Sequence, residues 1–271
     1  MSDSAKGKYA QVNGINLYYE VHGKGKPLIL LHGGLGSTGM FGEVLPLLAA
    51  GRQAIAADLQ AHGRTADIDR AMTFEAMADD IAALIKHLGF QQVDVIGYSL
   101  GGGVALQTAI RHPELIRKLV LVSTPFKRDG WYPENREGMS QMGPAIAEQM
   151  KQTPVYQDYA RIAPRIDDWV VLLTKLGNLL RMEYDWSNAI PSVQSPTLIV
   201  VGDWDAVRTA HAVEFFELLG GGKVDAGWDG SRMSTARLAI LPGVTHYTIT
   251  SAPILATTVI PFLDAPMPES G

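Results

Sequence analysis

The sequence predicts an α/β protein in which a mostly parallel sheet carries helices on both faces. Short apolar runs rich in β-branched residues recur along the chain, and most are followed by a segment with helical periodicity. Strands that alternate with helices in this way favour a parallel sheet that is covered on both sides. The interval 126–195 holds no strand-like run. We therefore expect a core of residues 1–125 and 196–271, with residues 126–195 forming a helical cap inserted after the sixth strand.

The first two expected strands form a hairpin. Asn13-Gly14 lies between the alternating runs Tyr9–Val12 and Ile15–Val21 and favours a two-residue turn. The next run is continuously apolar, as expected for a parallel strand that is buried on both faces. The later expected strands are of the same kind. In chain order these runs are Pro27–Leu31, Ala54–Asp58, Val93–Ile96, Leu119–Ser123, Thr197–Val201 and Leu238–Leu241.

Helical patterns fill the intervals between these strands. Within the expected cap they are Pro144–Met150 and Trp169–Met182. The connection Gly220–Ala236 is longer than the fold needs, and we expect it at the rim of the sheet opposite the functional site, as a surface segment or as a homodimer contact. The helical patterns of the core are Gly42–Leu48, Phe74–Leu88, Gly102–Arg111, Ala212–Leu219 and Ile254–Leu263.

Composition excludes several classes of function. The 271 residues are 46% hydrophobic and 19% charged, with 28 acidic against 23 basic side chains, which is ordinary for a soluble globular protein. The basic residues are scattered, so we expect no nucleic-acid partner. The chain has no cysteine, which excludes disulfides and thiolate chemistry. Met1–Tyr9 is polar and lacks an apolar stretch, so we expect neither a secretory signal nor a membrane anchor, and a cytoplasmic location.

The most informative motif is the segment Gly97–Gly101, which reads Gly-Tyr-Ser-Leu-Gly and follows the expected strand Val93–Ile96 directly. A serine hydroxyl becomes a useful nucleophile when a sharp strand-to-helix turn lifts it clear of the backbone beside a base. Such a turn brings backbone segments so close that side chains at Gly97 and Gly101 would collide across it. The motif therefore predicts that Ser99 is a nucleophile.

A serine nucleophile requires a base and a carboxylate that orients the base. His246 follows the last expected strand, and Asp205 follows the strand Thr197–Val201. Because parallel strands end at the same edge of a sheet, these residues are expected to meet Ser99 there. Asp203 competes for the role of the carboxylate but is expected to cap its turn. His211 is a weaker competitor for the role of the base.

Backbone N–H groups are the expected donors for an oxyanion. Leu100, which follows the nucleophile, supplies one, and Gly34, in the loop after Pro27–Leu31, supplies the other. His32 is expected to brace that loop. Residues near the strand ends and aromatic residues of the cap are candidates for the substrate-binding wall, with ordinary core packing as the alternative for each. These candidates are Leu35, Tyr98, Phe126, Trp131, Trp169 and Val207.

These motifs resemble the α/β-hydrolase superfamily over nearly the full length of the chain. The matching segments include His32-Gly33-Gly34 and Asp58–Thr65, together with the triad candidates in the order Ser, Asp, His. The loop after the fourth strand departs from the family pattern, because Ala61 stands where relatives have a glycine. A positive backbone angle would be awkward for alanine, so we expect a slightly rearranged turn there.

The resemblance implies a carboxylesterase that forms an acyl-enzyme on Ser99 with small to medium, fairly apolar esters. It implies no metal and no organic cofactor. Serine at position 99 separates the chain from relatives with an aspartate nucleophile. Two alternatives stay open at this stage: a lactonase or carbon–carbon bond hydrolase of the same fold, and a ligand-binding member without turnover.

Overall fold

The computed structural model describes residues 7–268 of the chain and contains an eight-stranded sheet in the order β1-β2-β4-β3-β5-β6-β7-β8. The N-terminal stretch Met1–Tyr9, for which we expect no secretory signal, lies mostly outside the described residues. β1 and β2 pair antiparallel, β2 also pairs antiparallel with β4, and the other neighbours are parallel. The predicted mostly parallel sheet is thus confirmed. Its strands are β1 Lys8–Val12, β2 Ile15–His22, β3 Lys26–Leu31, β4 Arg52–Ala57, β5 Val93–Tyr98, β6 Ile116–Val122, β7 Thr197–Trp204 and β8 Arg237–Thr245.

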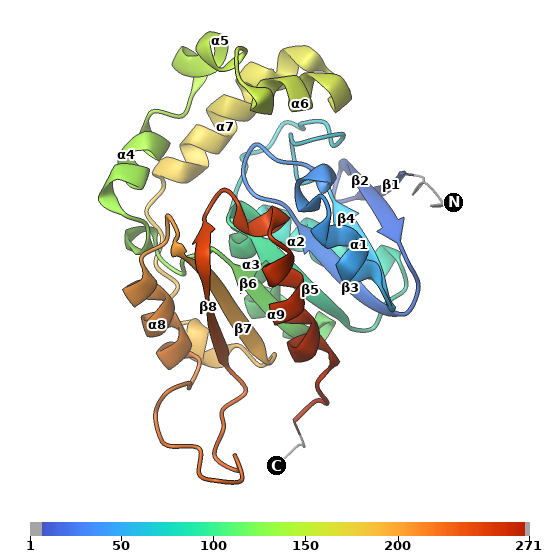
Figure 1. Ribbon diagram of the computed structural model, residues 1–271. Coiled ribbons are helices and arrows are strands. Elements are labelled where there is room, and N and C mark those ends of the chain that lie inside the picture. Colours follow the sequence, from blue (N-terminus) through green and yellow to red (C-terminus); the bar gives the residue numbers. More distant parts are fainter. Residues whose placement is uncertain (1–6, 269–271) are drawn as a thin grey trace.

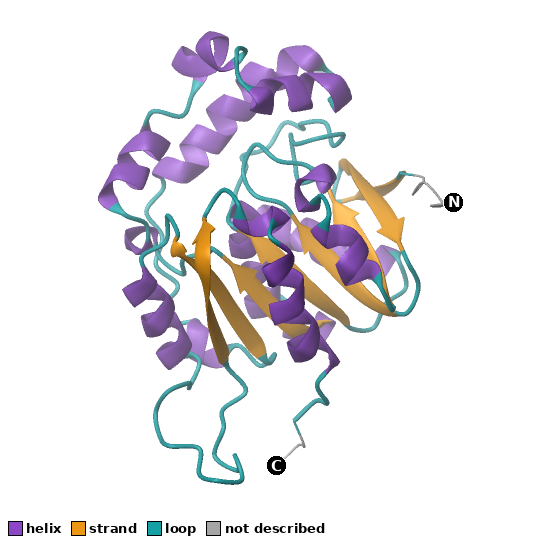
Figure 2. Ribbon diagram, in the orientation of Figure 1, coloured by secondary structure: helices purple, strands orange, loops and turns teal. Residues whose placement is uncertain are grey.

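Helices cover both faces of the sheet, as predicted (Figure 2). On one face, α1 (Val44–Ala49) packs against α9 (Pro253–Asp264) over a core formed by alternate residues of the central strands. On the other face lie α2 (Phe74–His87), α3 (Leu100–Arg111) and α8 (Thr209–Leu218). The central strands bury side chains toward both layers, which explains their continuous apolar runs.

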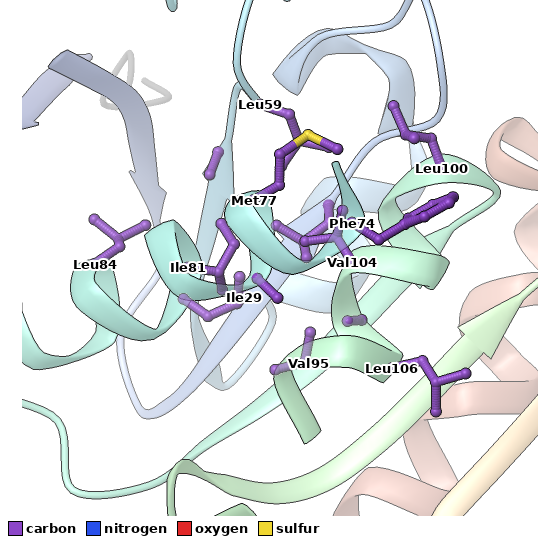
Figure 3. Close-up of a cluster of buried hydrophobic side chains, with 14 of the residues drawn as sticks. Ile29, Leu59, Phe74, Met77, Ile81, Leu84, Val95, Leu100, Val104 and Leu106 are labelled. Carbon is purple, nitrogen blue, oxygen red and sulfur yellow. The ribbon is translucent and has the colours of Figure 1, made fainter. Parts of the chain in front are cut away.

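The contact between α2 and the sheet shows how periodicity produces this core (Figure 3). Phe74, Met77, Ile81 and Leu84 recur at helical spacing along one side of α2 and are all buried. Thr73 caps the helix, because its side chain accepts a hydrogen bond from the N–H of Ala76 at 3.1 Å. The apolar stripe of α2 packs with α3 and the strands and thereby holds the part of the sheet that carries Ser99.

The interval between β6 and β7 is helical and lies over one end of the sheet (Figure 1). Its longest helix, α7, buries one side in the same apolar core as the sheet. The sequence predicted α5 and α7 but not α4 and α6. α4 has no buried residue, so it carries no apolar stripe that a pattern could detect. The division of the chain into a core and a separate cap stays a prediction. The helices are α4 Pro133–Ser140, α5 Ala147–Met150, α6 Pro154–Ile162 and α7 Trp169–Arg181.

The long connection between α8 and β8 lies at the end of the strands away from α4–α7 (Figure 1). Its surface position is confirmed by Val224, Trp228 and Met233, whose side chains are largely or fully exposed. A role in dimer formation stays a prediction. Over residues 7–268, no helix has the length and apolar character needed to span a bilayer, and no cluster of side chains suited to a metal ion is present.

Candidate active site

Ser99 occupies the sharp turn between β5 and α3. Its backbone has φ 52° and ψ −116°, a conformation that a serine adopts only at a cost of about 1–3 kcal/mol. A Cβ atom on Gly97 would lie 2.3 Å from the carbonyl oxygen of Gly101, and one on Gly101 would lie 2.4 Å from that of Leu31. The two glycines therefore permit the close approach of the backbone on which this turn depends.

The structure brings Ser99, His246 and Asp205 together at the carboxyl edge of the sheet. The Nδ1 atom of His246 lies 2.9 Å from Oδ1 of Asp205, and its Nε2 atom lies 3.2 Å from Oγ of Ser99. Because a carboxylate only accepts, the contact with Asp205 favours a proton on Nδ1. Nε2 then has a free lone pair directed at the serine hydroxyl, which is the tautomer that a general base requires.

The Asp205 carboxylate is almost fully enclosed by donors. Its Oδ2 accepts hydrogen bonds from the hydroxyl of Ser123 and from the N–H of Gly202, while Oδ1 also accepts from the N–H of Val207. Burial opposes its ionisation, but the hydrogen bonds and charge of His246 and the donors Ser123 and Gly202 together lower the pKa of Asp205 below its usual value. Asp205 is therefore the ionised partner of His246.

Asp203 lies apart from this cluster. Its exposed carboxylate accepts hydrogen bonds from the N–H groups of Gly243 and Val244, at 2.8 and 3.3 Å. Asp203 thus joins the end of β7 to the turn in β8. His211 also lies elsewhere: its Nε2 accepts from the N–H of Phe126, and burial lowers its pKa to about 4. Neither residue contacts Ser99.

Ser123 is a site residue that the sequence reasoning missed. It directly follows β6, with φ 52°, and its hydroxyl lies between the strands that carry Ser99 and Asp205. A serine after an apolar run carries no distinctive pattern. Its position gives a weak sequence signal. The end of β6 borders β7, so a polar side chain there lies near the carboxylate that follows β7.

The two N–H groups that are predicted to receive an oxyanion have no partner in the described part of the protein. Those of Gly34 and Leu100 border the same cavity as Ser99, and neither has an acceptor within residues 7–268. His32 supports the loop of Gly34, since its Nδ1 donates to the carbonyl of Gly33 at 2.7 Å and its Nε2 accepts from the N–H of Leu59. Burial lowers the pKa of His32 to about 3, so this brace is neutral.

A mostly apolar cavity of about 210 Å³ opens above Ser99. The core contributes its floor, and the segment between β6 and β7 contributes much of its wall. α7 presents Leu176 and Leu180, spaced one helical turn apart, which is the sequence signal that could have found them. The lining residues are Gly34, Leu35, Phe74, Ser99, Leu100, Gly103, Thr124, Pro125, Arg128, Trp131, Asn135, Met139, Met142, Leu176, Leu180, Tyr184, Ala206, His246 and Tyr247.

Of the six predicted wall residues, Leu35 and Trp131 line this cavity. The edge-to-face contact of Trp131 with the His246 ring, at 5.3 Å between centroids, places the indole beside the catalytic candidates. Leu35 lies in the loop of Gly34 with φ 60°.

The other four predicted wall residues pack elsewhere. Phe126 is fully buried and stacks on His211 at 4.2 Å between centroids. Trp169 donates from its indole nitrogen to the carbonyl of Ala147 and belongs to the interior of the helical segment. Val207 packs against Trp131, and Tyr98 lies behind His246, donating its hydroxyl to the His246 carbonyl at 2.7 Å. Each is therefore corrected from a wall residue to a supporting residue.

Ala61, in the loop after β4, has φ 63°, so this alanine adopts the left-handed conformation that usually favours glycine. Asp58 closes the loop by accepting from the N–H groups of Thr38 and Arg64. Burial raises the pKa of Asp58 to about 6.

Comparison with known proteins places this geometry in context. A family model described as "alpha/beta hydrolase fold" matches residues 26–159. The serine hydrolase BPHL of Mus musculus is 31% identical over 215 residues, which is 75% of this chain and 72% of that protein.

Two bacterial relatives match over shorter stretches. The soluble epoxide hydrolase of Corynebacterium sp. (strain C12) is 37% identical, covering 45% of this chain and 43% of that protein. The 2-hydroxy-6-oxo-6-(2'-aminophenyl)hexa-2,4-dienoic acid hydrolase of Metapseudomonas resinovorans is 33% identical, covering 43% of this chain and 42% of that protein. This chain thus spans less than half the length of either relative.

Solved structures agree over nearly the whole chain. The E-2-(acetamidomethylene)succinate hydrolase superposes with a TM-score of 0.75 at 20% identity, covering 96% of this chain and 100% of that one. A thermophilic esterase from Thermogutta terrifontis gives a TM-score of 0.71 at 22% identity, covering 96% of this chain and 98% of that one. At these identities the likeness establishes the fold alone.

Proposed function

Because this chain belongs to the α/β-hydrolase family, we propose that it is a hydrolase and that its reaction is the hydrolysis of carboxylic esters through an acyl-enzyme on Ser99. The hydrogen-bonded series from Asp205 through His246 to Ser99, at the floor of an apolar cavity, carries the proposal. The reaction needs no metal and no organic cofactor, because each proton transfer and each charge has a partner among these residues and the two free N–H groups.

The proposed acylation begins when Oγ of Ser99 attacks the ester carbonyl and its proton passes to Nε2 of His246. The carbonyl oxygen becomes an oxyanion and accepts hydrogen bonds from the N–H groups of Gly34 and Leu100. Collapse of the tetrahedral intermediate breaks the bond to the alcohol oxygen, which takes the proton from Nε2. Asp205 stabilises the imidazolium that exists between the two transfers.

Deacylation repeats these steps with water as the nucleophile. His246 removes a proton from water, the hydroxide adds to the acyl carbonyl, and Ser99 leaves with the proton returned from Nε2. The cavity of about 210 Å³ suits small to medium acyl or alcohol groups, and its apolar wall favours apolar ones. Such a wall discriminates weakly between homologous chains, by about 1–3 kcal/mol per methylene, so we expect broad specificity.

A second candidate is a lactonase or a carbon–carbon bond hydrolase with the same residues. The similarity to a dienoic acid hydrolase favours the carbon–carbon alternative. In carbon–carbon bond hydrolysis, the leaving group is a carbanion equivalent, so a proton must be delivered to carbon. The substrate panel below separates the candidates, because each class of bond appears in it.

The test combines substrates with active-site labelling. We expect the protein to hydrolyse p-nitrophenyl esters of short and medium chain length faster than lactones or dienone acids, and to form a fluorophosphonate adduct on Ser99. EDTA should leave the activity unchanged. Turnover of dienone acids alone would overturn the ester proposal in favour of the second candidate. Absence of both an adduct and any turnover would identify a ligand-binding protein.

A further inference from the structure

Arg128 carries the one permanent charge among the described residues that line the cavity above Ser99. It follows β6 by six residues and begins the turn Arg128–Gly130. Its side chain is 16% exposed, and the neighbouring wall is formed by apolar residues such as Leu180 and Met139. A cation held against an apolar wall is unfavourable unless an anion or strong acceptors surround it.

The protein provides hydrogen-bond acceptors for two of the three guanidinium nitrogens of Arg128, and these contacts fix its position. Nε donates to the carbonyl of Leu180 at 3.2 Å, and Nη1 donates to Oε1 of Glu183 at 2.8 Å. The backbone N–H of Arg128 also donates to the carbonyl of Tyr184. The side chain is therefore tied to the end of α7 and the residues that follow it.

The remaining nitrogen, Nη2, has no acceptor within residues 7–268. Glu183 is 79% exposed, so it neutralises the guanidinium from the solvent side. Asn135 of α4 also lines the cavity, and its side-chain amide likewise has no hydrogen-bond partner within the described range. Two polar groups thus border an apolar cavity with hydrogen-bonding capacity that the protein does not use.

We propose that the substrate of Ser99 carries a carboxylate, which Arg128 binds through Nη2 and Asn135 through its amide nitrogen. A guanidinium matches a carboxylate or a phosphate in geometry and charge, and the carboxylate is the smaller of the two for a cavity of about 210 Å³. The chemical class is an anionic ester such as the half-ester of a dicarboxylic acid, and hydrolysis of a half-ester yields a dicarboxylate. This inference rests on the proposed ester hydrolysis and specifies its substrate.

The test compares monomethyl glutarate with its neutral counterpart dimethyl glutarate, using kcat and KM for each. We expect the protein to prefer the anionic ester. Arg128→Gln should raise KM for the half-ester about 10- to 100-fold, the range for one hydrogen bond to a charged group, and should raise KM for the diester by a much smaller factor, because the diester has no carboxylate for Arg128 to bind. Arg128→Lys should retain part of the preference, because it keeps the charge without the fixed direction of the Nη2 donor.

Two further variants distinguish recognition from damage to the fold. Arg136→Gln is the matched control, because Arg136 forms an ion pair with Asp129 and does not line the cavity. It should leave both KM values unchanged. Glu183→Gln removes the competing carboxylate and should lower KM for the half-ester, an improvement that unfolding cannot produce.

Binding provides a readout that does not depend on turnover. Glutarate should bind Ser99→Ala protein in a calorimetric titration, and Arg128→Gln in that background should abolish the binding. Equal losses for the half-ester and the diester in Arg128→Gln, or no preference for the half-ester in the unaltered protein, would overturn the inference while leaving ester hydrolysis intact. Retained glutarate binding without hydrolysis of any ester would instead refute the proposed function alone.

Discussion

At Ser99 the backbone conformation of one residue fixes the geometry of the whole candidate site. The positive φ turns the hydroxyl toward Nε2 of His246 and leaves the N–H of Leu100 at the start of a helix, where the helix dipole favours an anion. The strain at this position is balanced by the close backbone packing that Gly97 and Gly101 allow. The position of the Ser99 hydroxyl therefore depends on the backbone conformation of this turn.

Substitution of the triad candidates should separate catalysis from folding. Ser99→Ala should abolish turnover and leave the thermal midpoint unchanged or higher. Asp205→Asn should lower kcat by up to about 10⁴-fold, the loss that the wrong histidine tautomer causes in serine proteases. Asp203→Asn is the matched control and should have a small effect, because Asp203 contacts the turn of Gly243. If Asp203→Asn proves more damaging than Asp205→Asn in a p-nitrophenyl ester assay, the assignment of the carboxylate is wrong.

Ser123 should act on catalysis through Asp205. Ser123→Ala removes the hydroxyl that donates to Oδ2 of Asp205 and leaves that buried oxygen with the N–H of Gly202. Loss of one hydrogen bond to a charged group is worth about 1.5–3 kcal/mol, so kcat should fall about 10- to 100-fold. Added to Asp205→Asn, the same substitution should cost little more, because the two changes disrupt one network. Additive losses in kcat would mean that Ser123 acts independently.

At the scale of elements, the helical segment between β6 and β7 both closes the cavity and belongs to the core. α7 buries its apolar side with the sheet, while α4 buries nothing and borders the cavity with Asn135 and Met139. Aromatic residues of this segment therefore have two distinct roles, since Trp131 lines the cavity and Phe126 fills the interior.

Truncation at these two aromatic positions should have different consequences. Trp131→Ala enlarges the cavity beside His246 and should shift the preference among p-nitrophenyl esters toward longer acyl chains. The ratio of kcat/KM for a longer ester to that for a shorter one should rise about 10-fold or more. Phe126→Ala should leave the preference unchanged but lower the free energy of unfolding by about 3–5 kcal/mol, as for other buried aromatic residues. Phe126→Leu is a milder variant that should fold and give the same ester profile. A shifted profile in Phe126→Leu would contradict this division of roles.

The loop after β4 offers a comparison of one substitution in two backbone conformations. Ala61 has φ 63°, whereas Ala57 lies within β4, and both side chains are buried. Ala61→Gly should relieve about 1–2 kcal/mol of strain, which offsets the lost methyl group and the added chain entropy. Ala57→Gly relieves nothing and should cost about 1.5 kcal/mol. Urea denaturation should therefore rank Ala61→Gly as the more stable variant, and equal costs would show that Ala61 is unstrained.

At the scale of the whole molecule, three histidines are buried in the neutral form. Burial lowers the pKa of His32 to about 3 and that of His62 and His211 to about 4. Since the unfolded chain binds protons at these sites below about pH 6.5, the unfolded state binds more protons than the folded state between pH 4 and 6.5. Stability contributed by these sites is therefore fully present above pH 6.5 and declines as the pH falls.

The free energy of unfolding is expected to fall between pH 7.5 and pH 5. Each histidine contributes about 2 kcal/mol to the loss. Buried carboxyl groups whose pKa is raised, with Asp58 the largest at about 6, take up protons on folding in this range and offset part of it. Guanidinium denaturation at both pH values measures the difference.

Two variants of this experiment identify the source of the pH dependence. His62→Asn should reduce the difference in the free energy of unfolding between the two pH values, because the unfolded chain then binds one proton fewer at pH 5. His87 is exposed and serves as the control, so His87→Gln should leave the pH dependence of the free energy of unfolding unchanged. Equal stability of the unaltered protein at pH 7.5 and pH 5 would contradict the assignment of neutral buried histidines.

The sequence predicted the parts of the molecule that repeat a pattern or end a strand. Continuous apolar runs mark strands that are buried on both faces, and residues after such strands must meet at one edge, which is why Ser99, Asp205 and His246 could be named together. Ser123 carries no pattern, and α4 has no apolar stripe. Phe126 and Trp169 were misplaced because an aromatic residue near a strand end or on an apolar helix face looks the same whether it lines a cavity or fills a core. Their environments depend on packing between distant segments.

The edge contact between Trp131 and the His246 ring has an optical consequence. Indole emission responds to the polarity of its surroundings and is quenched by a nearby protonated imidazole. Fluorescence of Trp131 would therefore report both ligand entry and protonation of His246 without a coloured substrate. The other four tryptophans also emit, and of these Trp204 and Trp228 are largely or fully exposed. Trp204→Phe and Trp228→Phe would remove the exposed background, and the difference in emission between that protein and its Trp131→Phe variant would isolate the signal from the cavity.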